Sequence, residues 1–79
     1  MDDRQVLDRI GALVEEEHTL ERQATGAGLD DDRARIQHLE VELDQCWDLL
    51  RQRRARRSAG LDPDDATPRS EGTVEGYQQ

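Results

Sequence analysis

The sequence predicts an all-α fold: an antiparallel two-helix hairpin, coiled-coil-like, that dimerises into a four-helix bundle and carries a flexible C-terminal tail. Two amphipathic segments with apolar residues three and four positions apart flank a glycine-containing turn. A third segment has two prolines and few apolar residues, which favours an extended or mobile chain. We therefore expect a helical hairpin over residues 1–59 and a mobile acidic tail over residues 60–79.

The first helix is predicted at about residues 3–24. Its apolar residues follow spacings of four, three, seven and four, as on one face of a coiled-coil helix. They are Val6, Ile10, Leu13, Leu20 and Ala24. Asp2 or Asp3 can cap the start of the helix. The pattern stops before the predicted turn at residues 25–29, where Gly26 can adopt the left-handed conformation that ends a helix.

The second helix is predicted at about residues 30–58, opened by a run of aspartates and ended at Gly60. Its stripe keeps three-four spacing and consists of Ile36, Leu39, Leu43, Cys46 and Leu50, with Trp47 on its flank. A short connection makes the helices antiparallel. This arrangement places Val6 and Ile10 opposite Cys46, Trp47 and Leu50, and it places Leu20 opposite Ile36.

Two helices are too few to cover these apolar residues, because Leu7, Val14 and Trp47 widen the stripes. A dimer of hairpins solves the problem by forming a four-helix bundle. The residues predicted to form its core and interface are Val6, Ile10, Leu13, Leu20, Ile36, Leu39, Leu43, Cys46, Trp47 and Leu50.

The composition restricts the class of protein. The 79 residues carry a net charge of -8, with 38 % charged and 33 % hydrophobic residues. A net negative charge opposes attraction to nucleic-acid phosphates. No apolar run is long enough to span a membrane. The one cysteine cannot form an internal disulfide, which suits a reducing cytoplasm. We expect a cytoplasmic protein that binds neither membrane nor nucleic acid.

The arginine-rich end of the second helix has two interpretations. Its members are Arg51, Arg53, Arg54, Arg56 and Arg57. They can pair with the acids of the first helix, or they can bind phosphates of RNA or DNA. Four acids lie just upstream in residues 33–59 and the tail is acidic, so we favour ion pairing within or between chains. The nucleic-acid interpretation is the alternative.

Three candidate chemical sites have simpler explanations. Glu15 and His18 have the spacing of half a di-iron site that Glu40 or Glu42 would complete, but their heptad positions point outward. Cys46 lies on the apolar stripe, where a free cysteine packs as a small hydrophobe, although nearby arginines can make a thiol reactive. Glu17 occupies a core position within reach of Arg33 and Arg35, where a polar group can fix the helix register. We predict no catalytic residue, metal or cofactor.

Three segments resemble a known family. They are the run from Glu42 to Ala55 (ELDQCWDLLRQRRA), residues 13–18 (LVEEEH) and residues 74–77 (VEGY). Together they resemble a family of short, uncharacterised actinobacterial proteins that is grouped as a domain of unknown function. The resemblance implies a bacterial, cytoplasmic, helical protein with no assigned activity. It also strengthens the hypothesis that Tyr77, with Val74, docks the tail; these are the tail's only substantial apolar anchors.

The function predicted from the sequence is that of a non-enzymatic interaction or adaptor module. It would act as a homodimer and bind an unidentified protein partner through helix contacts. The alternative is a nucleic-acid-binding or ribosome-associated accessory protein that uses the basic run from Arg51 to Arg57.

Overall fold

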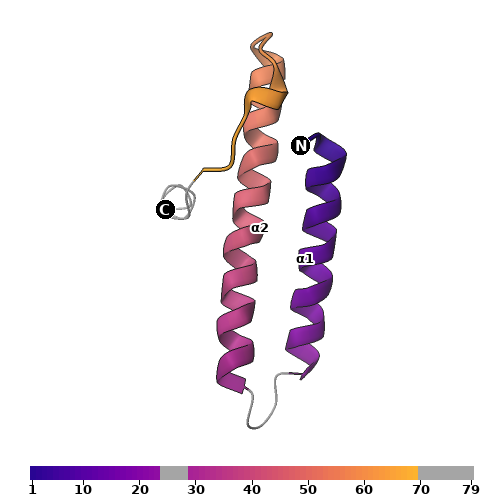
Figure 1. The fold of residues 1–79 in the computed structure, drawn as a ribbon, viewed down its shortest axis with the longest axis vertical. Coiled ribbons are helices and arrows are strands. Elements are labelled where there is room, and N and C mark those ends of the chain that lie inside the picture. Colours follow the sequence, from indigo (N-terminus) through magenta and orange to yellow (C-terminus); the bar gives the residue numbers. More distant parts are fainter. Residues whose placement is uncertain (24–28, 70–79) are drawn as a thin grey trace.

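The computed structural model describes residues 1–23 and 29–69, and the described part is helical without strands. Helices α1 (Asp3–Gln23) and α2 (Leu29–Ser58) lie side by side and antiparallel, and a short 3-10 helix, η2 (Pro63–Asp65), follows them (Figure 1). This arrangement confirms the predicted all-α hairpin, and the observed helix bounds lie within one residue of the predicted ones. Most of the predicted turn lies outside the described residues.

The start of α1 is fixed by reciprocal hydrogen bonds. Asp2 Oδ1 accepts a hydrogen bond of 2.8 Å from the backbone N–H of Gln5. In return, Gln5 Oε1 accepts one of 2.8 Å from the backbone N–H of Asp2. The two bonds form a capping box, which satisfies N–H groups that have no partner within the helix. Of the two capping candidates, Asp2 is therefore the one used.

Gly60 ends α2, as its position in the sequence predicts. It has a φ of 74°, in the left-handed region that glycine adopts at little cost. The N–H of Leu61 donates to the carbonyl of Arg56 at 2.8 Å, and the N–H of Gly60 donates to Arg57 at 3.1 Å. These two bonds make a Schellman motif. The chain reverses there and returns along α2.

The core is small. Five hydrophobic side chains are buried among the described residues, namely Val6, Ile10, Leu13, Leu39 and Leu49. The structure brings Val6 and Ile10 together with Leu49, and it packs Cys46 and Leu50 against them as the antiparallel pairing predicts. Leu43 also packs on this cluster. Leu20 and Ile36, which were expected to face each other near the turn, are both half-buried.

Trp47 and Leu49 depart from the predicted core. Trp47 was expected to pack on Val6 and Ile10, but its side chain is 46 % exposed. A helix turns 100° per residue, so Trp47 lies on the flank of the stripe that contains Cys46. Leu49 is buried although it lies off the predicted stripe, at 6 % exposure. Ala66, from the chain beyond α2, packs against the cluster that contains Leu49, and the sequence pattern of α2 alone does not reveal this contact.

Residues 62–69, here called the tail segment, are docked on α2 (Figure 1). Ala66 packs against the core cluster, and the Gln52 side chain donates a hydrogen bond of 2.9 Å to the carbonyl of Thr67. The prediction of a mobile tail from residue 60 onward is therefore corrected for this segment. The prediction rested on the low apolar content of the tail, whereas the contacts that dock this segment on α2 are largely hydrogen bonds and ion pairs. Val74 and Tyr77 lie outside the described residues.

A buried arginine connects the tail segment to both helices. Arg53 is 4 % exposed. Its Nε donates to Asp3 Oδ1 at 2.5 Å, and its Nη1 donates to the carbonyl of Pro63 at 3.1 Å and to Asp64 Oδ1 at 3.0 Å. A buried guanidinium without partners would cost several kcal/mol. The ends of α1, α2 and the tail segment are therefore tied together through one side chain.

We expect removal of residues 62–79 to lower the free energy of unfolding by about 2 kcal/mol, because Arg53 loses acceptors and the core loses Ala66. Chemical denaturation followed by circular dichroism measures the change. Removal of residues 70–79 alone is the control, and the difference between the two truncations assigns the loss to the tail segment. Equal stability of the two truncations would contradict this assignment.

Candidate interaction surface

The hairpin has two unlike sides. On one side, here called the closed side, ion pairs join the helices and the tail segment covers α2. Arg9 Nη2 of α1 lies 2.9 Å from Glu42 Oε2 of α2, and Arg35 Nη2 of α2 lies 2.8 Å from Glu16 Oε1 of α1. His38 Nε2 lies 3.1 Å from Glu42 Oε1. The ion pairs between exposed side chains are each worth about 0–1 kcal/mol.

The tail segment is held on the closed side by a polar stripe of α2. Gln45, Asp48 and Gln52 lie three and four residues apart and so share one face of the helix. Asp48 is fully buried and accepts hydrogen bonds from both Arg69 and Gln52, with Arg69 Nε at 2.8 Å and Gln52 Nε2 at 3.0 Å. A second Arg69 nitrogen also donates to Asp48. Gln45 donates to the carbonyl of Arg69 at 3.4 Å.

These contacts explain how a carboxylate can be buried. A buried charge is tolerated only when it is paired and hydrogen-bonded. The hydrogen bonds from Arg69, and then from Gln52, hold the pKa of Asp48 below its usual value despite burial. The sequence pattern does not identify Asp48 as a buried residue, because an aspartate on a highly charged helix is expected to be exposed to solvent. Its burial depends on Arg69, which lies 21 residues later in the chain.

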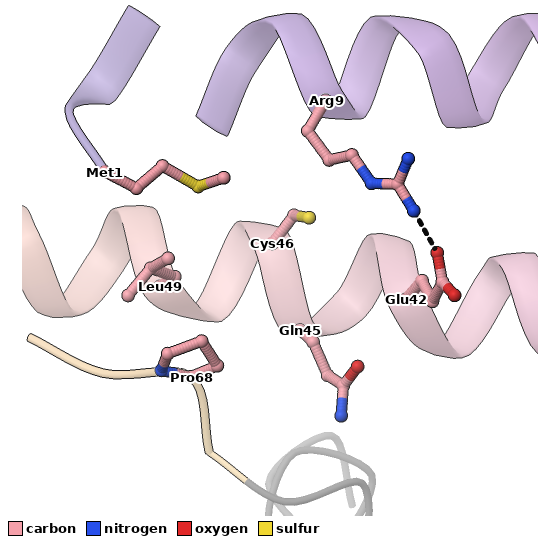
Figure 2. A pocket seen from close by; sticks show the side chains of 7 residues that line it. All are labelled: Met1, Arg9, Glu42, Gln45, Cys46, Leu49 and Pro68. Carbon is pink, nitrogen blue, oxygen red and sulfur yellow. Dashed lines mark hydrogen bonds and ion pairs between the residues drawn. The ribbon is translucent and has the colours of Figure 1, made fainter. Parts of the chain in front are cut away.

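A recess of about 270 Å³ lies on the closed side, between the start of α1 and α2 (Figure 2). It is lined by Met1, Arg9, Glu42, Gln45, Cys46, Leu49 and Pro68. Burial raises the pKa of the Cys46 thiol, and Glu42 adds to this effect while Arg9 opposes it. A thiol with a raised pKa is a poor nucleophile at neutral pH. Its packing against the core cluster supports the structural role that the sequence favours.

The other side of the hairpin, here called the open side, exposes apolar side chains. A groove of about 360 Å³ runs between the ends of the two helices. It is lined by Asp3, Leu7, Trp47, Leu50, Arg51, Arg54 and Arg57. Leu7 is 50 % exposed and Trp47 is 46 % exposed. Large, adjacent, exposed apolar side chains with a charged rim are typical of protein interaction sites.

Three of the five arginines in the basic run are used within the chain. Arg53 is buried between Asp3 and Asp64, as described above. Arg57 Nη2 lies 2.8 Å from Asp3 Oδ2, and Arg56 Nη2 lies 3.5 Å from Asp65 Oδ2. Hydrogen bonds from Arg57 and Arg53 lower the pKa of Asp3. The acids that pair with the run thus come from the tail segment as well as from the start of α1.

The remaining two arginines belong to the open side. Arg51 lies 3.9 Å from Asp48, at the limit of an ion pair, and its side chain is 55 % exposed. Arg54 is exposed and has no ion pair among residues 1–23 and 29–69. The antiparallel pairing predicted from the sequence places Asp2, Asp3 and Asp8 near Arg51 and Arg54. Of these acids, Asp3 is the observed partner from α1, and it binds Arg53 and Arg57.

Glu17 is half-buried in the seam between the helices, as its heptad position predicts. It was expected within reach of Arg33 and Arg35, but Arg35 pairs with Glu16 instead. Burial raises the pKa of Glu17, and the nearby charges of Glu21 and Glu40 raise it further. A role for Glu17 in fixing the register stays a prediction.

The remaining candidate site residues from the sequence do not come together in a metal or catalytic site among the described residues. Glu15 and His18 are both exposed on α1, which is the outward orientation that their heptad positions predict. Within the described ranges, no three His, Cys, Asp or Glu side chains gather as metal ligands. No described helix has the length and hydropathy needed to cross a lipid bilayer.

Comparison with known proteins identifies the family of this chain. The family model described as "Protein of unknown function (DUF2630)" matches residues 2–79. The chain belongs to the DUF2630 family. Its relatives include uncharacterized proteins of Mycobacterium bovis and of two strains of Mycobacterium tuberculosis. Each is 46 % identical over 77 residues, which cover 95 % of this chain and 88 % of the relative. No solved structure matches.

Membership of the DUF2630 family confirms the resemblance to short, uncharacterised actinobacterial proteins. Neither the family description nor the names of the relatives assign an activity.

We expect Asp48→Asn to lower the melting temperature at pH 7, because a neutral amide cannot form the ion pair with Arg69. The folded-state pKa of Asp48 is lowered. Its stabilising contribution is therefore present above the unfolded pKa of about 3.9 and is lost as the pH falls through the folded value. The difference in melting temperature from the wild type should be constant between about pH 5 and 8 and should shrink as the pH falls below about 3.9 toward the folded-state pKa.

Thermal denaturation followed by circular dichroism across this pH range tests the expectation. Asp8→Asn is the matched control, since Asp8 is an exposed acid of α1. A difference that is as large at pH 2 as at pH 7 would show that Asp48 acts through shape and not through charge.

Proposed function

We propose that this protein is a non-enzymatic helical interaction module that self-associates through its open side. The observation that carries the proposal is the exposure of Leu7 and Trp47 beside the half-buried Leu50, in a groove between two helices. A second hairpin placed there would cover these side chains and complete a four-helix bundle.

The thickness of the molecule supports this proposal. The chain measures 52 × 26 × 15 Å, and its shortest dimension is close to the diameter of a single helix with its side chains. Stable domains normally pack at least two layers of helices or sheets around a core. A hairpin one layer thick leaves the open side of both helices uncovered, and a second hairpin would supply the missing layer.

The use of the arginines favours protein contact over nucleic-acid contact. Arg53, Arg56 and Arg57 already bind acids of the same chain, which leaves Arg51 and Arg54 to offer positive charge. Two arginines on a chain of net charge -8 give little attraction for a phosphate backbone. We therefore keep self-association as the proposed function and the cytoplasm, which suits a lone free thiol, as its proposed location.

We expect the wild-type protein to sediment as a dimer at micromolar concentration and Trp47→Ala to raise the dissociation constant at least tenfold, because a buried tryptophan is worth about 2 kcal/mol or more at an interface. Sedimentation equilibrium measures both. Leu61→Ala is the matched control, since Leu61 is 53 % exposed but lies beyond the end of α2 and outside the groove.

Trp47 contributes little to the hairpin core, so circular dichroism of Trp47→Ala should retain its helicity. A wild-type protein that stays monomeric at about 100 μM would contradict the proposal, since specific dimers of this size normally form in that range. Co-purification of nucleic acid that is lost as salt rises would favour the alternative.

A further inference from the structure

A second heptad stripe runs along α2 on the open side. Its members follow spacings of four, three, four, three and four, and they are Ile36, Glu40, Leu43, Trp47, Leu50 and Arg54. It shares Ile36, Leu43 and Leu50 with the stripe that faces α1, but its centre is rotated toward Trp47. Glu40, Trp47 and Arg54 are exposed, whereas Leu39 on the α1-facing stripe is fully buried. The second stripe has the pattern of a coiled-coil seam, and no helix among residues 1–23 and 29–69 packs along it.

The charges of this stripe are placed symmetrically about Trp47. Glu40 precedes Trp47 by seven residues and Arg54 follows it by seven, so each lies about 10.5 Å from Trp47 along the helix axis. The two residues have opposite charge. A copy of α2 that is reversed in direction and centred on Trp47 would therefore place each glutamate opposite an arginine.

We propose that the occupant of the open side is a second copy of this chain, docked with its α2 antiparallel to the first. The two Trp47 side chains lie beside the twofold axis, and Glu40 of each chain pairs with the partner's Arg54. This arrangement rests on the proposed self-association, and it specifies the geometry of the dimer. The same residues contact each other from both chains, as a twofold interface requires.

The charge distribution selects this direction over the parallel one. In a parallel pair of α2 helices, each position of the stripe would face its own copy, so Arg54 would meet Arg54 and Glu40 would meet Glu40. Like charges opposite each other are destabilising, whereas the antiparallel pair converts both contacts into attractions. Asp44 and Arg51 lie three and four residues on either side of Trp47 and repeat the same complementarity closer to the axis.

Two features of the hairpin support contact on this side. Glu40 lies near Glu17, where the acids repel one another and no basic side chain of the described chain forms an ion pair with Glu17. The partner's Arg54 would bring the missing positive charge to this group. Gly11, one helical turn from Leu7, has open space where a side chain would be, so a partner helix can approach α1 closely there.

Charge reversal tests the pairing. Glu40→Arg should place arginine opposite arginine at two symmetric positions and raise the dimer dissociation constant at least tenfold at low salt. Arg54→Glu should have the same effect by placing glutamate opposite glutamate. An equimolar mixture of the two variants should form a heterodimer with near wild-type affinity, and the double variant E40R/R54E should recover homodimers.

Sedimentation equilibrium of each sample and of the mixture measures these affinities, and circular dichroism checks that helicity is retained. Arg4→Glu is the matched control, since Arg4 is an exposed arginine of α1 without an ion pair among the described residues. Unchanged affinity in both single variants would overturn the pairing of Glu40 with Arg54.

A distance measurement tests the direction independently. Spin labels on Ser58→Cys in a Cys46→Ala background should lie about 35 Å apart in the antiparallel dimer, because each label is eleven residues from the axis at 1.5 Å per residue. Parallel helices would bring the labels to about 10–15 Å. A dimer with the short distance would overturn this geometry but leave the proposed self-association intact. A monomeric wild-type protein would overturn both.

Discussion

The buried guanidinium of Arg53 is the interaction on which the rest of the structure depends. It binds Asp3 at the start of α1 and Pro63 and Asp64 of the tail segment, so it joins three parts of the chain at the end of the hairpin that has no connecting turn. Arg53 lies one helical turn beyond Leu49 of the core cluster and adds a paired, buried charge to the apolar contacts there. Because a buried charge requires specific partners, it also fixes how the tail segment lies.

The position of the tail segment makes the two sides of the hairpin unequal. Its docking buries Leu49 and Asp48 on the closed side and leaves Leu7 and Trp47 uncovered on the open side. Two bare helices would offer similar surfaces for association in either direction. With one side covered, a second copy has one apolar side left to contact, so the tail segment limits the number of arrangements that a dimer can adopt.

The sequence predicts the helices well because their signals are local. Spacing of apolar residues defines both helices, and Gly60 marks the end of α2. The tail segment could not be predicted in this way, since its docking depends on Asp48 meeting Arg69 and on Gln52 meeting a backbone carbonyl. Such polar pairs across 15 or 21 residues leave no periodic pattern. Trp47 was misplaced for a related reason: periodicity shows that it flanks the stripe but does not decide whether a neighbour covers it.

The polar stripe of α2 has a consequence for sequence change in the family. Gln45 and Gln52 donate to main-chain carbonyls of the tail segment, and every residue type has a main-chain carbonyl. The side chain of Thr67 can therefore be exchanged without loss of the bond to Gln52. Asp48 and Arg69 contact each other through their side chains, so the contact is lost when either residue is replaced in a relative. These two positions should therefore change together, whereas the side chain at position 67 is free to vary.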